Sequence, residues 1–188
     1  ICTIFILYDF IAIRQGIAFS FILLSYYSIV ERNFKKYFFM IFIASLFHFS
    51  AIILLLIYPI VIRQYRTIFL YLALSIIFCL NFFQIQIGLA TLILENISLP
   101  AFTLEKLNAY SIAEDTSFLS IKQLFIGDLF VSMYNYLKDF KPHILPMVNI
   151  YILGMILATL LSDIGQVSYR LRWYFFIYEI VLIPIFLN

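Results

Sequence analysis

Arg14 and Gln15 form the first pair of side chains suited to binding a charged group, and they stand directly before Gly16 and an apolar run. An arginine guanidinium stays charged at any relevant pH, and its planar fork of donors matches phosphate oxygens. At the mouth of a helix that begins near Ile17, this pair could hold a lipid-linked pyrophosphate. The alternative is an interfacial anchor, because arginine side chains also reach out to lipid headgroups.

His48 is the second candidate. It lies between Phe47 and Phe49 in an apolar run, where an ionisable group is costly and therefore a candidate for function. Imidazole can act as a general base, or donate a hydrogen bond to a substrate hydroxyl or phosphate. The alternative is a neutral histidine whose hydrogen bond fixes the packing of helices.

The third candidate is the segment Ser168–Tyr174, in which Arg170 and Arg172 alternate with aromatic residues. Two arginines beside Trp173 and Tyr174 suit an anionic headgroup that carries a stacked sugar. The same composition is typical of the aromatic belt and basic anchors of an ordinary membrane helix.

Three further ionisable residues stand in apolar surroundings. Lys122 and Asp128 share one run but point about 240° apart around a helix, so either each has a partner on another helix or the segment lies in the membrane interface. Glu179 follows Arg172 by two helical turns, about 10 Å along one face. That distance is too long for a direct pair but suits two groups that flank one ligand.

Motifs for a metal, nucleotide or nucleophilic site are absent from the sequence. The five glycines are isolated, no His-Glu-x-x-His occurs, and Cys2 and Cys79 are too far apart for a Cys-x-x-Cys site. We therefore expect no cofactor and no protein-bound metal. Cys79 stands in an apolar run, so we expect a small core residue.

The amino-acid composition indicates which kind of fold must position these charged and polar side chains. Of the 188 residues 65% are apolar and 12% are charged, whereas soluble globular domains have about 45–50% and about 25%. The net charge of +2 is too small and too dispersed for nucleic acid to be the partner. The fold class predicted is all-α, a polytopic bundle of transmembrane helices.

About six hydrophobic segments are predicted, since about 20 apolar residues cross a bilayer core. They cover residues 17–30, 37–62, 67–94, 118–137, 144–162 and 173–187, and residues 95–117 form the longest polar stretch. The chain begins inside an apolar run, with no Met and no signal peptide. We therefore expect one transmembrane domain, residues 1–188, that is the C-terminal portion of a longer protein.

Orientation depends on whether the run Tyr37–Ile62 crosses once or turns back near His48 as a re-entrant hairpin. A single crossing divides lysine and arginine almost evenly, so the positive-inside rule then gives no orientation. A hairpin places the basic clusters on the inner side. Arg14, His48, the 95–117 loop, Arg170 and Arg172 then share the outer side. We prefer the hairpin; an alternative places the break in 67–94, where Asn81–Gly88 is polar.

Four stretches in this order resemble EpsG-family membrane proteins, which are related to the Wzy polymerases of O-antigen and capsular polysaccharide. They are Arg14–Ala18, Leu46–Ala51, Arg170–Phe175 and Leu182–Pro184. The resemblance implies a multi-pass protein of the bacterial inner membrane. It also implies glycosyl transfer that polymerises undecaprenyl-diphosphate-linked oligosaccharide units into O-antigen, capsule or exopolysaccharide. That reaction takes place on the outer face, beside flippase and chain-length regulator proteins.

The resemblance also assigns roles to residues. It implies that Arg14, Gln15, Arg170 and Tyr174 bind substrate and that His48 is catalytic. Arg172 departs from the pattern, which has a polar residue there, and we include it with the binding residues. The arginines would neutralise the departing diphosphate. His48 would position or deprotonate the acceptor hydroxyl, and the alternatives for that role are Glu114, Asp115 and Asp128. The alternative functions are a transporter or flippase of lipid-linked oligosaccharide, which needs no general base, and a structural membrane subunit.

Overall fold

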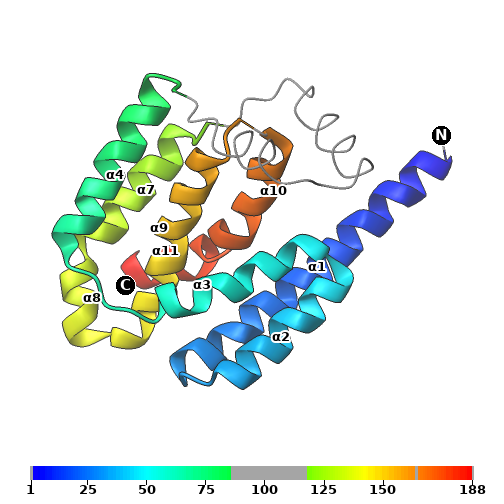
Figure 1. Ribbon diagram of the computed structural model, residues 1–188, viewed down its shortest axis with the longest axis horizontal. Helices are drawn as coiled ribbons and strands as arrows, with labels where there is room; N and C mark the ends of the chain where they lie inside the picture. Colours follow the sequence, from blue (N-terminus) through cyan, green and yellow to red (C-terminus); the bar gives the residue numbers. More distant parts are fainter. Residues whose placement is uncertain (1, 86–117, 164, 188) are drawn as a thin grey trace, which may run out of the picture. The chain divides into compact units, whose positions relative to one another are not determined.

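The computed structural model describes residues 2–85, 118–163 and 165–187. The polar stretch 95–117, predicted as an outer-side loop, lies outside these residues. Throughout the described ranges the regular structure is helical and contains no strand (Figure 1). The chain divides into two compact units, Ile1–Gln64 and Tyr65–Asn188, and each is described here by itself.

The first unit begins with a pair of antiparallel helices, α1 (Cys2–Val30) and α2 (Phe34–Phe47). The turn between them uses Arg32 in the left-handed region, with φ 53°. Asn33 then caps α2, because its side chain accepts a hydrogen bond from the Lys36 amide. Residues three and four apart form the buried faces of both helices. These are Ala18, Ile22, Ser25 and Ile29 on α1, and Tyr37, Ile41 and Ala44 on α2.

Helix α1 corrects the position expected for Arg14 and Gln15. The sequence placed them at the mouth of a helix beginning near Ile17, but α1 runs without interruption from Cys2. The reason is that residues 2–13 contain no glycine or proline that would end a helix. Both residues therefore lie in the interior of a long helix.

The run Tyr37–Ile62 is broken at His48. Helix α2 ends at Phe47, His48 is extended with φ −144° and ψ 103°, and a 3₁₀ helix, Phe49–Ile53, leads into α3 (Leu54–Val61). The Tyr37 hydroxyl donates to the Leu54 carbonyl, and its ring lies 4.9 Å from that of Tyr58. Because Tyr37 lies in the first turn of α2, these contacts show that the chain reverses direction after His48. Its re-entrant placement in a membrane stays a prediction.

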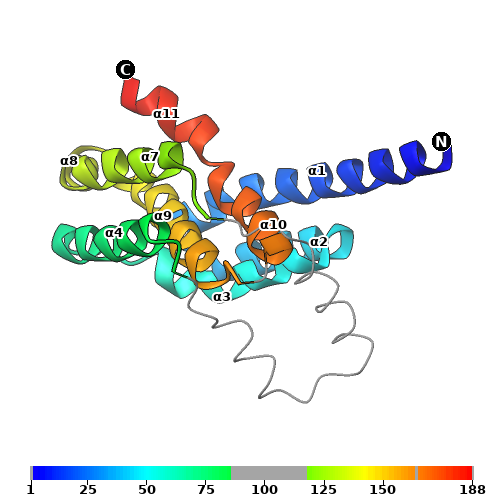
Figure 2. The ribbon, with the colours of Figure 1, turned by 90° about the horizontal axis from the view of Figure 1, so that it is seen from above.

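The second unit is built around α9 (Leu145–Leu160), of which eleven of the sixteen residues are buried. Five helices contact it (Figures 1 and 2). They are α4 (Thr67–Phe82), α7 (Ile121–Ser132), α8 (Tyr134–Phe140), α10 (Gly165–Phe176) and α11 (Glu179–Leu187), and the short 3₁₀ helix Pro142–Ile144 precedes α9.

Buried Asn81 connects three elements of this unit. Its amide donates to Thr159 Oγ1 on α9 at 3.0 Å, and its carbonyl accepts from the Leu119 amide, before α7, at 2.7 Å. Helix α4 ends directly after it at Phe82, and Gln84 takes a left-handed conformation with φ 53°. The polar segment Asn81–Gly88, the alternative location for a break, thus begins where a helix does end.

The last apolar run also differs from expectation. Residues 173–187 were predicted as one segment, but α10 ends at Phe176 and α11 begins at Glu179. Tyr178, in the break, is buried. The interruption separates Arg172 from Glu179, so these two residues do not share one face of a continuous helix.

Two described segments, Ile13–Val30 and Pro142–Leu160, are long and apolar enough to cross a membrane. Phe49–Val61 and Thr67–Phe82 are apolar but shorter. The all-helical class is thus confirmed for the described residues, while the count of six crossing segments stays a prediction.

Helices α9 and α10 approach closely at Gly154. A Cβ added there would overlap the Cβ of Phe175 and lie 2.7 Å from its Cγ. Both atoms are at the base of a fully buried side chain, so they cannot move without α10. One turn further along, Ser168 donates to the Ala158 carbonyl at 2.8 Å. This contact seats the segment that carries Arg170 and Arg172.

We expect Gly154→Ala to destabilise the protein by about 1–3 kcal/mol, the usual cost of overpacking a core. The measurement is the midpoint of thermal unfolding in detergent. Gly16→Ala is the matched control, because no atom lies within 4 Å of its added Cβ. Equal midpoints for the two variants would contradict the close approach of α9 and α10.

Candidate functional site

His48 lies at the reversal between α2 and α3. Its backbone amide donates to the Ala44 carbonyl at 2.9 Å, and its ring Nδ1 lies 2.7 Å from the Ser50 hydroxyl. The side chain is half-buried. Phe47 stacks on Phe21 of α1, with ring centroids 6.2 Å apart. Three contacts therefore hold the imidazole in place at the break: the backbone bond to Ala44, the ring contact with Ser50 and the packing of Phe47 on Phe21.

The hydrogen bond with Ser50 decides which nitrogen of the His48 ring carries the proton and which can accept one. If Ser50 donates to Nδ1, the neutral ring carries its proton on Nε2 and that nitrogen is a donor. If Nδ1–H donates to Ser50, Nε2 is an acceptor suited to taking a proton. Sequence reasoning did not assign Ser50 a role. A hydroxyl two residues after a histidine at a helix break is the signal that could have found it.

Arg14 and Gln15 lie on the same end of the first unit as His48. The contact of Phe21 with Phe47 sets the level of the two helices, and Arg14 precedes Phe21 by seven residues, about 10 Å along α1. The Arg14 side chain is exposed and that of Gln15 is half-buried. A charged ligand bound at this end of the unit could interact with the Arg14 guanidinium on α1 and with the His48 imidazole after α2.

Helix α10 carries the predicted residues of the second unit. The Arg172 guanidinium donates to the Phe118 carbonyl, directly before α7, at 3.0 Å. Arg170 belongs to the same helix, and its side chain lies outside what the structure describes. Tyr174 is 0% exposed. Its ring therefore supports the packing of α10, while Arg172 reaches toward the start of α7.

The expectation that Lys122 pairs with another helix is confirmed. Its Nζ lies 3.2 Å from Glu179 Oε2 at the start of α11. The other carboxylate oxygen of Glu179 accepts from the Tyr151 hydroxyl at 2.9 Å. Tyr151 belongs to α9, and its hydroxyl also lies 3.3 Å from the Gln123 carbonyl oxygen, a weaker second acceptor for its one proton. Sequence reasoning considered Glu179 but missed Tyr151, which it had no reason to separate from thirteen other tyrosines.

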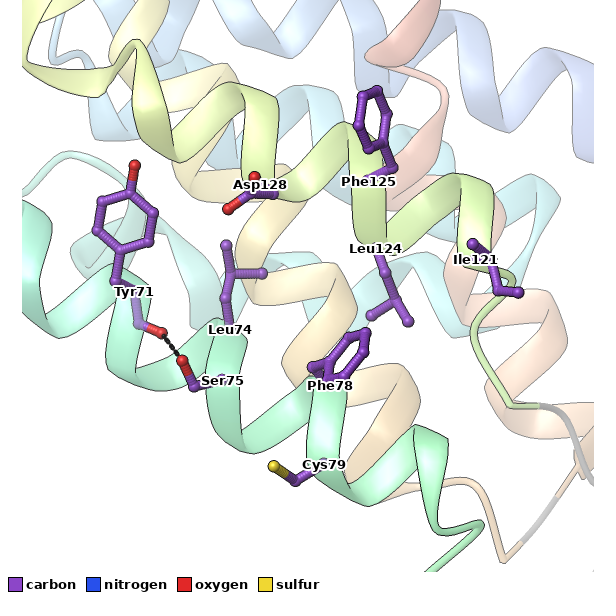
Figure 3. Close-up of a pocket in the computed structure, with 9 residues that line it drawn as sticks. All are labelled: Tyr71, Leu74, Ser75, Phe78, Cys79, Ile121, Leu124, Phe125 and Asp128. Carbon is purple, nitrogen blue, oxygen red and sulfur yellow. Dashed lines mark hydrogen bonds between the residues drawn. The ribbon is translucent and has the colours of Figure 1, made fainter.

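Asp128 lies instead on a groove between α4 and α7, about 560 Å³ in volume (Figure 3). Most of the lining is apolar, from Leu74 and Phe78 of α4 and from Ile121, Leu124 and Phe125 of α7, and it also includes Tyr71, Ser75 and Cys79. Cys79 is exposed, which corrects the expectation of a core residue. The reason is that α4 turns Leu70, Leu74 and Ile77 inward instead.

The predicted site residues divide between the two units. Arg14, Gln15 and His48 belong to the first unit, whereas Arg170, Arg172 and Tyr174 belong to the second. Among the residues that the structure describes, no three His, Cys, Asp or Glu side chains come together as a metal site would require. Each unit thus offers cationic and hydrogen-bonding groups, which suit an anionic ligand with hydroxyls.

The sequence model of the EpsG family matches residues 1–188, which is the whole chain. No curated protein and no solved structure matches it.

Proposed function

The chain belongs to the EpsG family, and on this premise we propose that it is a polysaccharide polymerase of the bacterial inner membrane. It crosses the membrane several times and acts as a hexosyltransferase on the outer face. Its substrate is an undecaprenyl-diphosphate-linked oligosaccharide, and its product is O-antigen, capsule or exopolysaccharide. The observation that carries the proposal is family membership over the full length, together with two helices apolar enough to cross a membrane.

The reaction needs two kinds of group. A hydroxyl oxygen of the acceptor unit attacks the anomeric carbon of the donor, and the bond from that carbon to the diphosphate breaks. The lipid diphosphate leaves with the electron pair, and the hydroxyl loses its proton. Arg14, Gln15, Arg170 and Arg172 bind the diphosphate and stabilise its developing charge. His48 takes the proton, with Ser50 holding its ring.

Tyr174 has an indirect place in this proposal. The residue was predicted to bind substrate, but its ring is buried. It contributes by seating α10 against α9, so that Arg170 and Arg172 are carried by a fixed helix.

A second candidate function, transport of the same lipid-linked oligosaccharide, draws support from two helix breaks. Transporters bind their substrates where membrane helices are interrupted, and this chain has interruptions at His48 and between α10 and α11. The same arginines would bind the same diphosphate. The transporter needs no group that accepts a proton.

Deletion of the gene tests the function. Loss of a polymerase leaves single repeat units on the outer face and removes the ladder of long polysaccharide from a gel. Loss of a transporter leaves the lipid-linked unit on the inner face. We expect the first pattern, with the ladder restored by a plasmid copy. An unchanged ladder in the deletion strain would refute the polymerase function.

A further inference from the structure

Glu179 is a largely buried carboxylate at a break in a helix. It is the first residue of α11, and its side chain is 14% exposed. Tyr151, which donates to it, stands midway along Pro142–Leu160, the more apolar of the two described segments that are long enough to cross a membrane. Ionisable groups at such depth in a membrane protein are costly and usually serve binding or transport. Glu179 therefore needs an explanation beyond packing.

The carboxylate retains capacity for a ligand. Oε1 accepts one hydrogen bond from Tyr151 and Oε2 one from Lys122. A carboxylate has about four acceptor sites, so two remain. The Lys122 side chain is 70% exposed and its ammonium has three donors. A hydroxyl could therefore donate to Glu179 and accept from Lys122 at the same time.

The surroundings point to a sugar as the ligand. Arg172 donates to the carbonyl of Phe118, one helical turn before Lys122, so a guanidinium lies on the same end of α7. The buried rings of Phe176 and Tyr151 lie 4.9 Å apart, so Phe176 supports the tyrosine whose hydroxyl donates to Glu179. A carboxylate and an ammonium that lie side by side, one accepting and one donating, match the hydroxyls of a pyranose, which both donate and accept.

We propose that Glu179 and Lys122, held by Tyr151, form a binding site for hydroxyls of the acceptor sugar. The proposal rests on the polymerase function and adds a site that positions the incoming unit. Glu179 contacts the substrate, and Tyr151 positions Glu179. The alternative explanation for the same contacts is a tether that only joins α7, α9 and α11.

The test is a steady-state assay of the full chain in lipid nanodiscs. The substrate is the undecaprenyl-diphosphate-linked repeat unit that accumulates in the deletion strain. Glu179→Gln keeps the size of the side chain but removes its charge. We expect KM to rise about tenfold or more, with kcat within about threefold of wild type, because hydrogen bonds to charged groups are strong. Lys122→Arg, which keeps the charge and the donors, should keep most of the wild-type affinity.

Two exposed residues of α8 provide matched controls, Asp139→Asn and Lys138→Gln. Both should leave KM and kcat unchanged. If Glu179→Gln fails to fold, Lys122→Gln decides, because its exposed side chain can change without loss of packing. A KM equal to that of wild type in the folded variant overturns the site. So does a fall in the unfolding midpoint with an unchanged KM, which is the result for a tether. Absence of polymer from the wild-type protein would instead refute the polymerase function itself.

Discussion

Arg14→Ala and Arg170→Ala are each expected to remove long polysaccharide from a strain that carries only the variant gene. Each change removes a permanent positive charge and a fork of donors from the proposed diphosphate site. Loss of one preorganised donor to a developing anion costs about 10²–10³ in rate. A polymer grows by many successive transfers, so a loss of this size should leave only short chains on the gel.

Replacing the arginine by lysine shows whether its positive charge or the shape of its guanidinium matters for polymerisation. Arg14→Lys keeps the charge but loses the planar fork, so we expect chains of intermediate length. Arg66→Ala is the control, since Arg66 is exposed before α4 and its side chain makes no capping hydrogen bond. Immunoblots of membrane fractions must show equal amounts of each variant. Full ladders from both alanine variants at normal expression would exclude the arginines from the site.

The fold was predictable where the sequence pattern is local. Apolar runs indicated helices, and the distribution of lysine and arginine favoured a turn at His48, where the structure contains a break. The start of α1 was misjudged because the polar pair Arg14 and Gln15 was interpreted as a boundary. Polar residues alone do not end a helix, and a single glycine inside one is tolerated, so α1 continues through Arg14, Gln15 and Gly16.

The break before Glu179 could not be predicted for a different reason. No glycine or proline stands at Ile177 or Tyr178 to indicate it. The contacts of Glu179 come from Tyr151, 28 residues away, and from Lys122, 57 residues away. Such pairs depend on tertiary packing, which overrides local propensity. The exposure of Cys79 could not be predicted for the same reason, because the helices that pack on α4 decide which of its faces is buried.

The residue types of the candidate site could be predicted from the sequence. The groups that hold these residues in place could not. Arginine and histidine are rare in apolar segments, so they stand out in any reading of the sequence. The groups that hold them are ordinary: a serine hydroxyl for His48 and a backbone carbonyl for Arg172. Nothing in their type distinguishes them before the fold brings them close.

His48→Gln is expected to abolish polymerisation while leaving the fold intact. Glutamine can keep a hydrogen bond to Ser50, and the bond from the backbone amide to Ala44 does not depend on the side chain. What it cannot do is accept a proton, and loss of a general base lowers turnover by about 10²–10⁴. We would measure turnover of lipid-linked repeat units in nanodiscs, with the unfolding midpoint as a check on folding.

The same variant separates a polymerase from a transporter. Movement of a lipid-linked oligosaccharide across a vesicle membrane forms no bond and needs no base, so a transporter should keep its rate in His48→Gln. Ser50→Ala gives a graded comparison, because the imidazole remains while its ring loses one hydrogen bond. We expect an intermediate loss of polymerisation, since the hydrogen bond with Ser50 helps to fix which ring nitrogen accepts a proton. Full polymerase activity in both variants would remove His48 from the chemistry and assign it to packing at the reversal between α2 and α3.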